Sequence, residues 1–320
     1  MIVQFLILAA GLTLILLGAN WLVDGSTSIA RKTGMSEFVI GLTIVGIGTS
    51  TPEMVVSFIS SFQGKSDMAI GNVIGSNIFN TLMILGVTAL VSPLVVTKEN
   101  LKRDIPLNIL VTLLLVGLGL KYTLFGVGGN EISRIDGALL LAIFCIYLWK
   151  SFKTGKQSEE EESEEDTVNH PIGLAIVMIL GGLAGLVIGG RLFVNSATAI
   201  AQMLHMSEKL IAITIMAAGT SMPELATCVV AARKGRGQLA LGNILGSNIS
   251  NILLILGGAA LIHPLSFGGI SIVDVCAIIL ASVVIMVCAY TFRKGYIDRK
   301  EAVIFLLLEL SYMAILLANG

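Results

Sequence analysis

Long apolar stretches, separated by short polar ones, run along almost the whole chain. A helix needs about 20 mainly apolar residues to cross the roughly 30 Å of hydrocarbon in a bilayer. Stretches near that length occur in two groups of five, with an acidic segment between the groups. The pattern predicts an all-α integral membrane protein with ten transmembrane helices, at residues 2–24, 37–63, 67–92, 105–120, 134–150, 171–203, 208–232, 239–263, 270–291 and 301–318.

Composition supports a membrane protein and excludes some partners. Hydrophobic residues make up 55% of the 320 residues and charged residues only 13%, fewer than the surface of a soluble protein needs. The formal net charge of -1 offers no excess positive charge to nucleic acid. The four cysteines lie scattered in apolar stretches, without the spacing of a metal site or a disulfide framework, so we expect no cofactor. The first stretch lacks a basic leader and a cleavage site, which predicts a retained helix.

Basic residues predict the orientation of the chain, because loops on the cytoplasmic side carry excess Lys and Arg. With both termini outside, fifteen of the twenty Lys and Arg residues fall on the inner side. The linker at residues 153–170 is then cytoplasmic, and it holds seven acidic residues between positions 159 and 166. Its charge predicts an unfolded hinge, and it lacks the glycine pattern of a calcium loop. We expect the protein in the cell membrane, with the lipid bilayer as partner and no obligate protein partner.

The two groups of spans are copies of each other, at residues 1–152 and 171–320. GTSTPE at 48–53 recurs as GTSMPE at 219–224, and GNVIGSNIFN at 71–80 recurs as GNILGSNISN at 242–251, both at an offset of 171 residues. Residues 71–86 and 242–257 match at eleven of sixteen positions. Since each copy holds five spans, an odd number, the second copy enters the membrane from the opposite side. Inverted repeats of this kind place the substrate site of a transporter near the midplane, between discontinuous helices.

The repeated GTSxPE motif predicts a break in each second span. Pro52 has no N–H to bond the carbonyl of Gly48, and Pro223 has the same relation to Gly219. The carbonyls near residues 46–49 and 217–220 should therefore lose helical partners. Such groups are tolerated in a membrane only beside protein or a polar cavity. The side chains there are hydroxyls and carboxylates, which are ligands for hard cations such as Ca²⁺.

Two glutamates, Glu53 and Glu224, complete these motifs inside the predicted spans. An ionisable residue within a membrane span is costly, and it indicates a functional site. In each following span, polar residues recur every four positions and so share one helix face; they are Asn72, Ser76 and Asn80, and Asn243, Ser247 and Asn251. The small residues Gly71, Gly75, Gly242 and Gly246 are expected to permit close helix contact.

Three other acidic residues lie in or near spans. Asp24 and Asp274 fall near predicted span ends, where we expect them to face water. Glu309 lies deeper, within FLLLELSYMAILL, and has no counterpart in the repeat, so its role stays open. The histidines fall near span ends, where we expect interfacial side chains.

On these motifs the chain resembles the cation/calcium exchanger superfamily, on its Na⁺/Ca²⁺ exchanger branch of prokaryotic calcium/sodium antiporters. GTSTPE with GSNIFN, and GTSMPE with GSNIS and Asn251, look like the two alpha-repeats of that family, at residues 40–86 and 211–257. The resemblance implies a gating pair formed by the first and sixth spans, which slides past a rigid core.

The resemblance also implies the ion ligands. Glu53 and Glu224 would coordinate both Ca²⁺ and Na⁺, and the other ligand or flanking positions would be Thr49, Thr220, Ser50, Ser221, Ser76, Ser247, Asn80, Asn251 and the carbonyls of Gly46 and Ala217. Some relatives carry aspartate at the position of Asn251, and in the K⁺-dependent branch that acid is associated with K⁺ transport. Asn251 therefore favours K⁺ independence.

These observations predict an electrogenic antiporter, not an enzyme, that exchanges Na⁺ for Ca²⁺ by alternating access at one two-glutamate site. Exchange of H⁺ for Ca²⁺ or another divalent cation stays open as an alternative, because protons compete with cations for neighbouring carboxylates. A cation channel lined by the same polar faces is a weaker alternative, since broken helices in an inverted repeat fit alternating access better. An intramembrane enzyme is weaker still, because no histidine lies near the predicted site.

Overall fold

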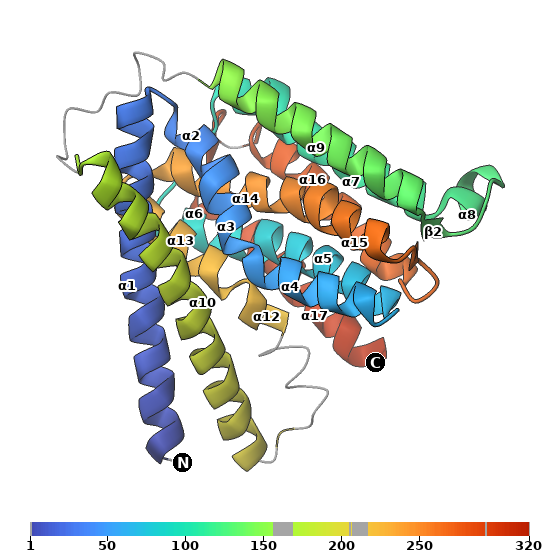
Figure 1. The fold of residues 1–320 in the computed structure, drawn as a ribbon, viewed down its shortest axis with the longest axis horizontal. Coiled ribbons are helices and arrows are strands. Elements are labelled where there is room, and N and C mark those ends of the chain that lie inside the picture. The colour runs from blue at the N-terminus through green and yellow to red at the C-terminus, as the bar shows by residue number, and fades with distance from the viewer. Residues whose placement is uncertain (1, 156–168, 205, 207–216, 292, 320) are drawn as a thin grey trace.

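A computed structural model describes residues 2–155, 169–204, 206, 217–291 and 293–319, and this part of the chain is almost entirely helical (Figure 1). The acidic residues of the linker and the start of the second alpha-repeat motif, residues 211–216, fall outside the described residues. The α-helices are α1 (Ile2–Thr33), α2 (Glu37–Ile40), α3 (Gly46–Thr49), α4 (Thr51–Phe62), α5 (Ser66–Phe79), α6 (Leu85–Val91), α7 (Ile105–Gly119), α8 (Lys121–Phe125), α9 (Arg134–Thr154), α10 (Ile172–Met203), α12 (Ala217–Thr220), α13 (Met222–Arg233), α14 (Gly237–Ser250), α15 (Gly257–Ile262), α16 (Ile272–Cys288) and α17 (Arg299–Asn319).

Wider π-helical turns interrupt or extend several of these helices. They are η1 (Gly41–Val45), η2 (Asn80–Ile84), η3 (Asn100–Asp104) and η6 (Asn251–Leu256). Two short antiparallel pairs each join the two halves of the chain: β1 (Leu94–Val95) pairs with β4 (Tyr296–Ile297), and β2 (Glu131–Ile132) pairs with β3 (Leu265–Ser266). The loops at both ends of the bundle are therefore tied together across the two copies.

Six helical segments in the described part of the chain are long and apolar enough to cross a membrane, and the bent pair Glu37–Thr49 and Thr51–Phe62 makes a seventh. The six are Ile2–Thr33, Ser66–Val91, Arg134–Lys153, Ile172–Met203, Gly237–Ile262 and Arg299–Ala318. Helices α7, α13 and α16 occupy the other predicted spans but are shorter, and residues 208–216 of the predicted seventh span are not described. Membrane insertion is thus supported, while the count of ten spans stays a prediction.

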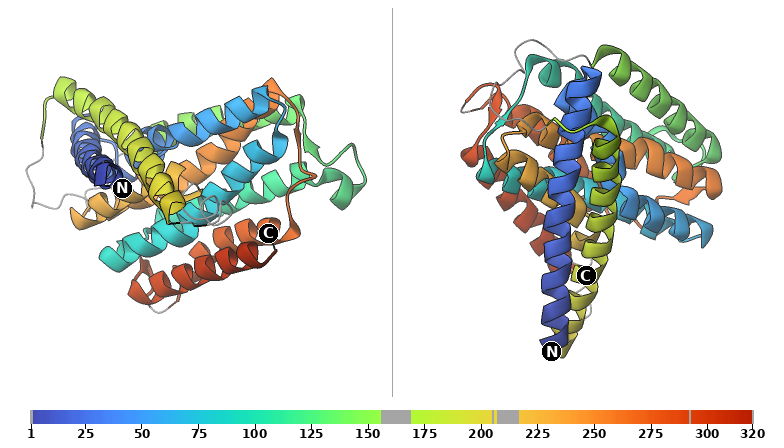
Figure 2. Two further views of the ribbon diagram at one scale, coloured as in Figure 1. Left: turned by 90° about the horizontal axis from the view of Figure 1, so that it is seen from below. Right: turned by 60° about the vertical axis from the view of Figure 1, so that its left-hand side comes forward.

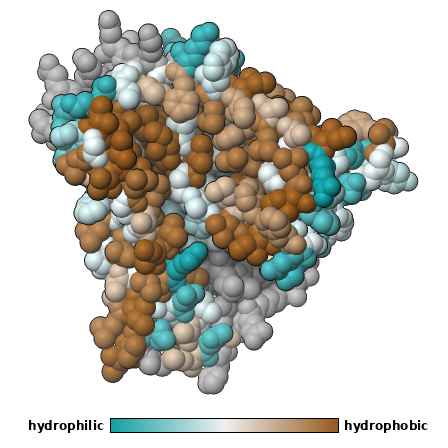
Figure 3. Space-filling view, in the orientation of Figure 1, coloured by the Kyte–Doolittle hydropathy of each residue, from teal (hydrophilic) through white to brown (hydrophobic). Residues whose placement is uncertain are grey.

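Helices α5 and α14 form the centre of the molecule, because each is packed by elements of both halves. All residues of α14 from Leu239 to Ser250 are buried. By contrast, α1, α9, α10 and α17 expose many large apolar side chains. Figure 3 shows broad hydrophobic areas on one face of the molecule, interrupted by smaller hydrophilic ones. Apolar surface of this extent fits a lipid environment.

Helices α1 and α10 lie side by side and extend together beyond the other helices (Figures 1 and 2). Glycines allow this close approach: a Cβ at Gly18 would lie 2.7 Å from the carbonyl oxygen of Gly182, and one at Gly11 would lie 2.9 Å from that of Gly189. The first helix continues past its predicted end at residue 24, to Thr33. These two helices are the first and sixth predicted spans.

The expectation of close glycine contacts is confirmed for one copy of the repeat. A Cβ at Gly242 would lie 2.2 Å from the carbonyl oxygen of Phe38, and one at Gly246 would lie 2.1 Å from that of Leu42. For Gly71 and Gly75, no atom of the described residues lies within 4 Å of the corresponding Cβ position. The segment that corresponds to Phe38 and Leu42 in the other copy, residues 209–213, lies outside the described residues, so the expectation for Gly71 and Gly75 stays a prediction.

Candidate functional site

The second span of the first copy breaks at Ser50, between α3 and α4, with a bend of 48°. Ser50 has φ -78° and ψ 12°, outside helical geometry, and Pro52 lies in the first turn of α4. The second copy has the same break at Ser221, with φ -89° and ψ 8°, and Pro223 in the first turn of α13. A proline in the first helical turn costs no hydrogen bond, so each motif ends one helix and begins the next.

The carbonyl groups at the first break only partly follow the expectation. The oxygen of Gly48 accepts a hydrogen bond from the Thr51 hydroxyl at 2.7 Å. The expectation is wrong for Gly46, whose oxygen keeps a backbone partner, the N–H of Ser50 at 3.3 Å. It also accepts from Ser247 Oγ of the other copy at 3.1 Å. At the break, the carbonyl oxygens of Gly46 and Gly48 therefore accept hydrogen bonds from side-chain hydroxyls.

The two glutamates meet at these breaks through crossed hydrogen bonds between the copies. Ser50 Oγ donates to Glu224 Oε1 at 3.0 Å, and Ser221 Oγ donates to Glu53 Oε1 at 3.2 Å. Both glutamate side chains are only 1% exposed. The structure thus brings together two motifs that lie 171 residues apart in the sequence, in a buried cluster with two carboxylates.

Four buried oxygens of this region have no hydrogen-bond partner among the described residues. They are Oε2 of Glu53 and Glu224 and Oδ1 of Asn80 and Asn251. Each pair occupies corresponding positions of the repeat, at the offset of 171 residues. Buried polar atoms are normally paired, so unpaired acceptors gathered in one region indicate a site for a ligand that accepts electron pairs.

Two further asparagines, Asn77 and Asn248, orient the amides of Asn80 and Asn251. Asn80 Nδ2 donates to Asn248 Oδ1 at 3.3 Å, and Asn251 Nδ2 donates to Asn77 Oδ1 at 3.0 Å. The Nδ2 groups of Asn77 and Asn248 donate in turn to the Asn248 backbone oxygen and the Thr81 hydroxyl, at 3.1 and 2.8 Å. Because the amide nitrogens are engaged, the Oδ1 atoms of residues 80 and 251 are left to accept.

Sequence reasoning missed the role of Asn77 and Asn248. The available signal was the identity of GSN in both copies, which places an asparagine beside each candidate serine. The π-helical turns η2 and η6 begin at Asn80 and Asn251, so the same wider turn occurs in both copies. Such turns are often found at functional sites.

The other candidates lie around this cluster, with differing contacts. Ser76 and Ser247 are buried, and Thr49 is buried with its Oγ1 at 3.0 Å from the Val45 oxygen and 3.1 Å from Asn243 Oδ1. Asn72 Nδ2 donates to the backbone oxygen of Glu53 at 3.1 Å. Ala217 begins α12, and its side chain falls outside the described part of the structure.

The remaining acidic residues have mixed surroundings. Glu309 is 2% exposed, and its Oε2 has no partner within the described part of the chain. Asp274 caps α16 and accepts from the Tyr312 hydroxyl at 2.8 Å. The expectation that Asp24 simply faces water is wrong, because it pairs with Lys234.

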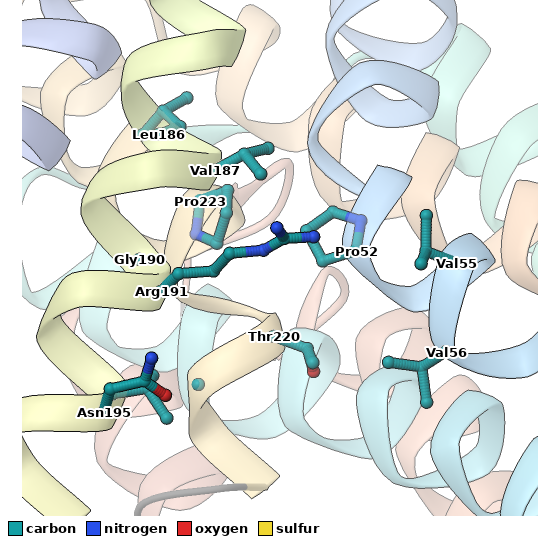
Figure 4. Close-up of a pocket in the computed structure, with 12 residues that line it drawn as sticks. Pro52, Val55, Val56, Leu186, Val187, Gly190, Arg191, Asn195, Thr220 and Pro223 are labelled. Carbon is teal, nitrogen blue, oxygen red and sulfur yellow. The ribbon is translucent and has the colours of Figure 1, made fainter. Parts of the chain in front are cut away.

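A cavity of about 250 Å³ lies beside the breaks, between α4 and α10. Pro52, Pro223 and Thr220 line it from the motif side, and Arg191 and Asn195 line it from α10. Figure 4 shows the Arg191 side chain crossing this space toward Pro52. The cavity thus adjoins the buried cluster through Thr220.

Clusters of three or more His, Cys, Asp or Glu side chains, which resident metal centres often use, do not occur among the residues that the structure describes. The acceptors present are two carboxylates, amide oxygens and hydroxyls. All of these are hard oxygen ligands, which suit Ca²⁺ and Na⁺ better than softer metals.

Comparisons with known proteins agree with this chemistry. The family model described as sodium/calcium exchanger protein matches residues 3–153 and 174–318. The chain is 37% identical to the putative antiporter CaxA of Alkalimonas amylolytica, over 100% of both chains. It is 34% identical to the sodium/calcium exchanger MaX1 of Methanosarcina acetivorans, over 98% of both. A solved structure of the sodium-calcium exchanger NCX_Mj, soaked with Na⁺ and without Ca²⁺, superposes with a TM-score of 0.83 at 34% identity, with 98% of both chains covered.

Proposed function

We propose that this chain, which belongs to the sodium/calcium exchanger family, exchanges Na⁺ for Ca²⁺ by alternating access at one site shared by its two halves. We further propose ten transmembrane helices in two inverted repeats of five, with both termini outside the cell membrane and the linker in the cytoplasm. The observation that carries the proposal is the set of four buried acceptor oxygens, of Glu53, Glu224, Asn80 and Asn251, that have no hydrogen-bond partner among the described residues.

The charge of this set suits the proposed ions. Two carboxylates supply a formal charge of -2, which one Ca²⁺ neutralises. Ca²⁺ takes about 6 to 8 oxygen ligands, including carboxylates and carbonyls, so the four unpaired oxygens need neighbours. We propose that these neighbours are Thr49, Thr220, Ser50, Ser221, Ser76, Ser247 and the carbonyls of Gly46 and Ala217, which also provide positions for Na⁺.

Exchange follows from the charge of the buried cluster. When ions are bound, their positive charge neutralises the two carboxylates of the cluster, and α1 and α10 can move across it. Without ions it carries two buried negative charges, which are costly in a low-dielectric interior and oppose this movement. The ion site therefore changes its access from one side of the membrane to the other only when Na⁺ or Ca²⁺ is bound.

The proposal includes net charge movement and independence from K⁺. If more than two Na⁺ move per Ca²⁺, each cycle transfers charge, and each unit charge is worth about 2.3 kcal/mol per 100 mV. Asn251 is neutral, so the site lacks a third carboxylate to balance K⁺. Equal Ca²⁺ uptake at clamped potentials of either sign, or uptake that requires K⁺, would contradict these two parts.

Exchange of H⁺ for Ca²⁺ is the second candidate, because the same carboxylates can bind protons. The neutral oxygens around them favour Na⁺, which needs several ligands where a proton needs one carboxylate. A channel is less well supported, since the acceptors are buried in a cluster that joins the two halves.

The decisive experiment is ⁴⁵Ca²⁺ uptake into proteoliposomes loaded with Na⁺, with K⁺ or with an acidic buffer. We expect Na⁺ loading alone to drive uptake, and Glu53→Gln and Glu224→Gln each to abolish it. Glu309→Gln is the matched control, because Glu309 is also a buried glutamate but is not part of the proposed site. Uptake driven by the pH gradient would favour the second candidate, and uptake that survives both site substitutions would refute the site.

A further inference from the structure

The two ends of the internal repeat are packed differently. Helix α1 packs along α13, the helix that carries Glu224. The corresponding pair in the other copy is α10 and α4, the helix that carries Glu53. These two helices are separated by the cavity of about 250 Å³ that Pro52, Val56, Val187 and Arg191 help to line. Among the residues that the structure describes, the α1/α13 face is therefore closed and the α4/α10 face is open at this cavity.

An ion pair lies on the closed face. Lys234 Nζ, directly after the last residue of α13, is 2.7 Å from Asp24 Oδ1 of α1. The side chains are 31% and 24% exposed, so the pair is partly shielded from water. It joins a helix of the proposed moving pair to a helix of the ion site.

The repeat carries no equivalent pair on the open face. At the offset of 171 residues, Asp24 corresponds to Asn195 and Lys234 corresponds to Gln63, and both counterparts are neutral. Asn195 lines the cavity itself (Figure 4). The charged pair thus coincides with the closed face, and its neutral counterparts coincide with the open face.

We propose that Asp24 and Lys234 form a one-sided ionic latch that favours the conformation closed at α1/α13 and open at α4/α10. The latch rests on the proposed function, because it requires alternating access. The latch makes the apparent ion affinities at the two faces unequal, because the site is accessible from the open face for a larger fraction of the time. When the site has the same intrinsic affinity in both conformations, the ratio of apparent affinities at the two faces equals the ratio of the two populations. In the proposed orientation, the latch lies on the cytoplasmic face.

The latch can be removed with residues that the protein already uses at the counterpart positions. Asp24→Asn and Lys234→Gln each install the residue of the other copy. The half-saturating Ca²⁺ concentration is measured in right-side-out and inside-out vesicles. We expect its ratio between the faces to change by about two- to fivefold, the range for a partly exposed ion pair. Binding should weaken at the cavity face and tighten at the latch face.

A matched control is available in a second ion pair. Arg236 Nη1 lies 3.2 Å from Glu37 Oε1, and this pair joins α14 to α2, two elements that pack directly on each other. Arg236→Gln should leave the ratio unchanged. The exchanged pair Asp24→Lys with Lys234→Asp should restore the wild-type ratio, which a purely steric role of these side chains does not explain.

Ionic strength gives an independent readout, because salt screens partly exposed charges. Choline chloride should reduce the inequality of the faces in the wild type but not in Asp24→Asn. Unchanged ratios in both single variants, with wild-type uptake intact, would overturn the latch alone. Wild-type uptake that responds only to a pH gradient would overturn Na⁺ coupling, and the same ratios measured with that gradient would still decide the latch.

Discussion

Gly246 offers a test of how closely packing and ion transport are connected in this protein. A Cβ at this position would lie 2.1 Å from the backbone oxygen of Leu42, in η1. Carbon and carbonyl oxygen approach one another at best to about 3.3 Å, so Gly246→Ala must separate α14 from η1 by about 1 Å. The obstacle is backbone, which cannot rotate away as a flexible side chain would.

The displacement reaches the proposed site directly. The neighbouring residue, Ser247, donates to the carbonyl oxygen of Gly46 at 3.1 Å, and Gly46 follows η1 in the chain. A shift of about 1 Å takes this contact beyond hydrogen-bond range. Overpacking of this kind costs about 1–3 kcal/mol of stability, and a misplacement of about 1 Å in a reactive site can reduce rates by about 100-fold. We expect Gly246→Ala to lower Na⁺-driven Ca²⁺ uptake at least about tenfold.

The assay is ⁴⁵Ca²⁺ uptake per reconstituted protein, together with thermal unfolding in detergent. Gly117→Ala in α7 is the control, because no described atom lies within 4 Å of its Cβ position, and it should transport at the wild-type rate. Ser247→Ala removes the hydroxyl without added bulk and so separates the lost hydrogen bond from the clash. Gly246→Ala with wild-type rate and Ca²⁺ affinity would refute this reasoning.

Three other predictions concern charge. Glu53→Gln should unfold at a higher temperature than the wild type in ion-free detergent, because it removes a buried carboxylate oxygen that has no partner among the described residues. It should also lose the stabilisation by Ca²⁺, which is about 2.7 kcal/mol for a binding protein at a Ca²⁺ concentration of about 100 times the Kd. Equal Ca²⁺ stabilisation of variant and wild type in melting curves would contradict this prediction. Asn251→Asp adds a third negative charge, so uptake should show a lower half-saturating Ca²⁺ concentration and a slower maximal rate, and an unchanged Ca²⁺ dependence would argue against Asn251 as a ligand. Arg191→Gln removes a positive charge beside the cavity. Two unit charges separated by about 10 Å in water repel each other by about 0.4 kcal/mol, so the half-saturating concentration should fall about twofold for Na⁺ and about fourfold for Ca²⁺. Arg191→Lys should behave as wild type, and equal shifts for both ions would refute the electrostatic cause.

Much of the fold was predictable because membrane helices follow hydropathy and because the repeat fixes the register of the two copies. The offset of 171 residues indicated that the two GTSxPE motifs act together, and the crossed bonds of Ser50 to Glu224 and of Ser221 to Glu53 place them together. The breaks at residues 50 and 221 were predictable from proline chemistry, since they are local.

Other features depend on contacts between distant elements and left no local signal. Asn77 and Asn248 hold the amides of Asn80 and Asn251; the identity of GSN in both copies marks these two asparagines, but it does not tell an orienting side chain from one that faces lipid. The partner of Asp24 lies 210 residues away, in the other copy, so its ion pair could not be anticipated. Hydropathy also placed the end of the first span at residue 24, whereas the helix continues because the polar residues that follow are buried.

The repeat itself separates two kinds of residue. An exchanger must present the same oxygens to its ions from either side, so residues of the proposed site gain from being identical in both copies, as in GTS, PE and GSN. A preference for one side requires a difference between the copies. Charged residues that the repeat does not preserve, such as Asp24 of α1 opposite Asn195, are positioned to provide it, because they lie on the helices that we propose to move rather than in the ion site. Substitutions in the first group should therefore change which ions are carried and how tightly, while substitutions in the second should change how unequally the two faces bind them.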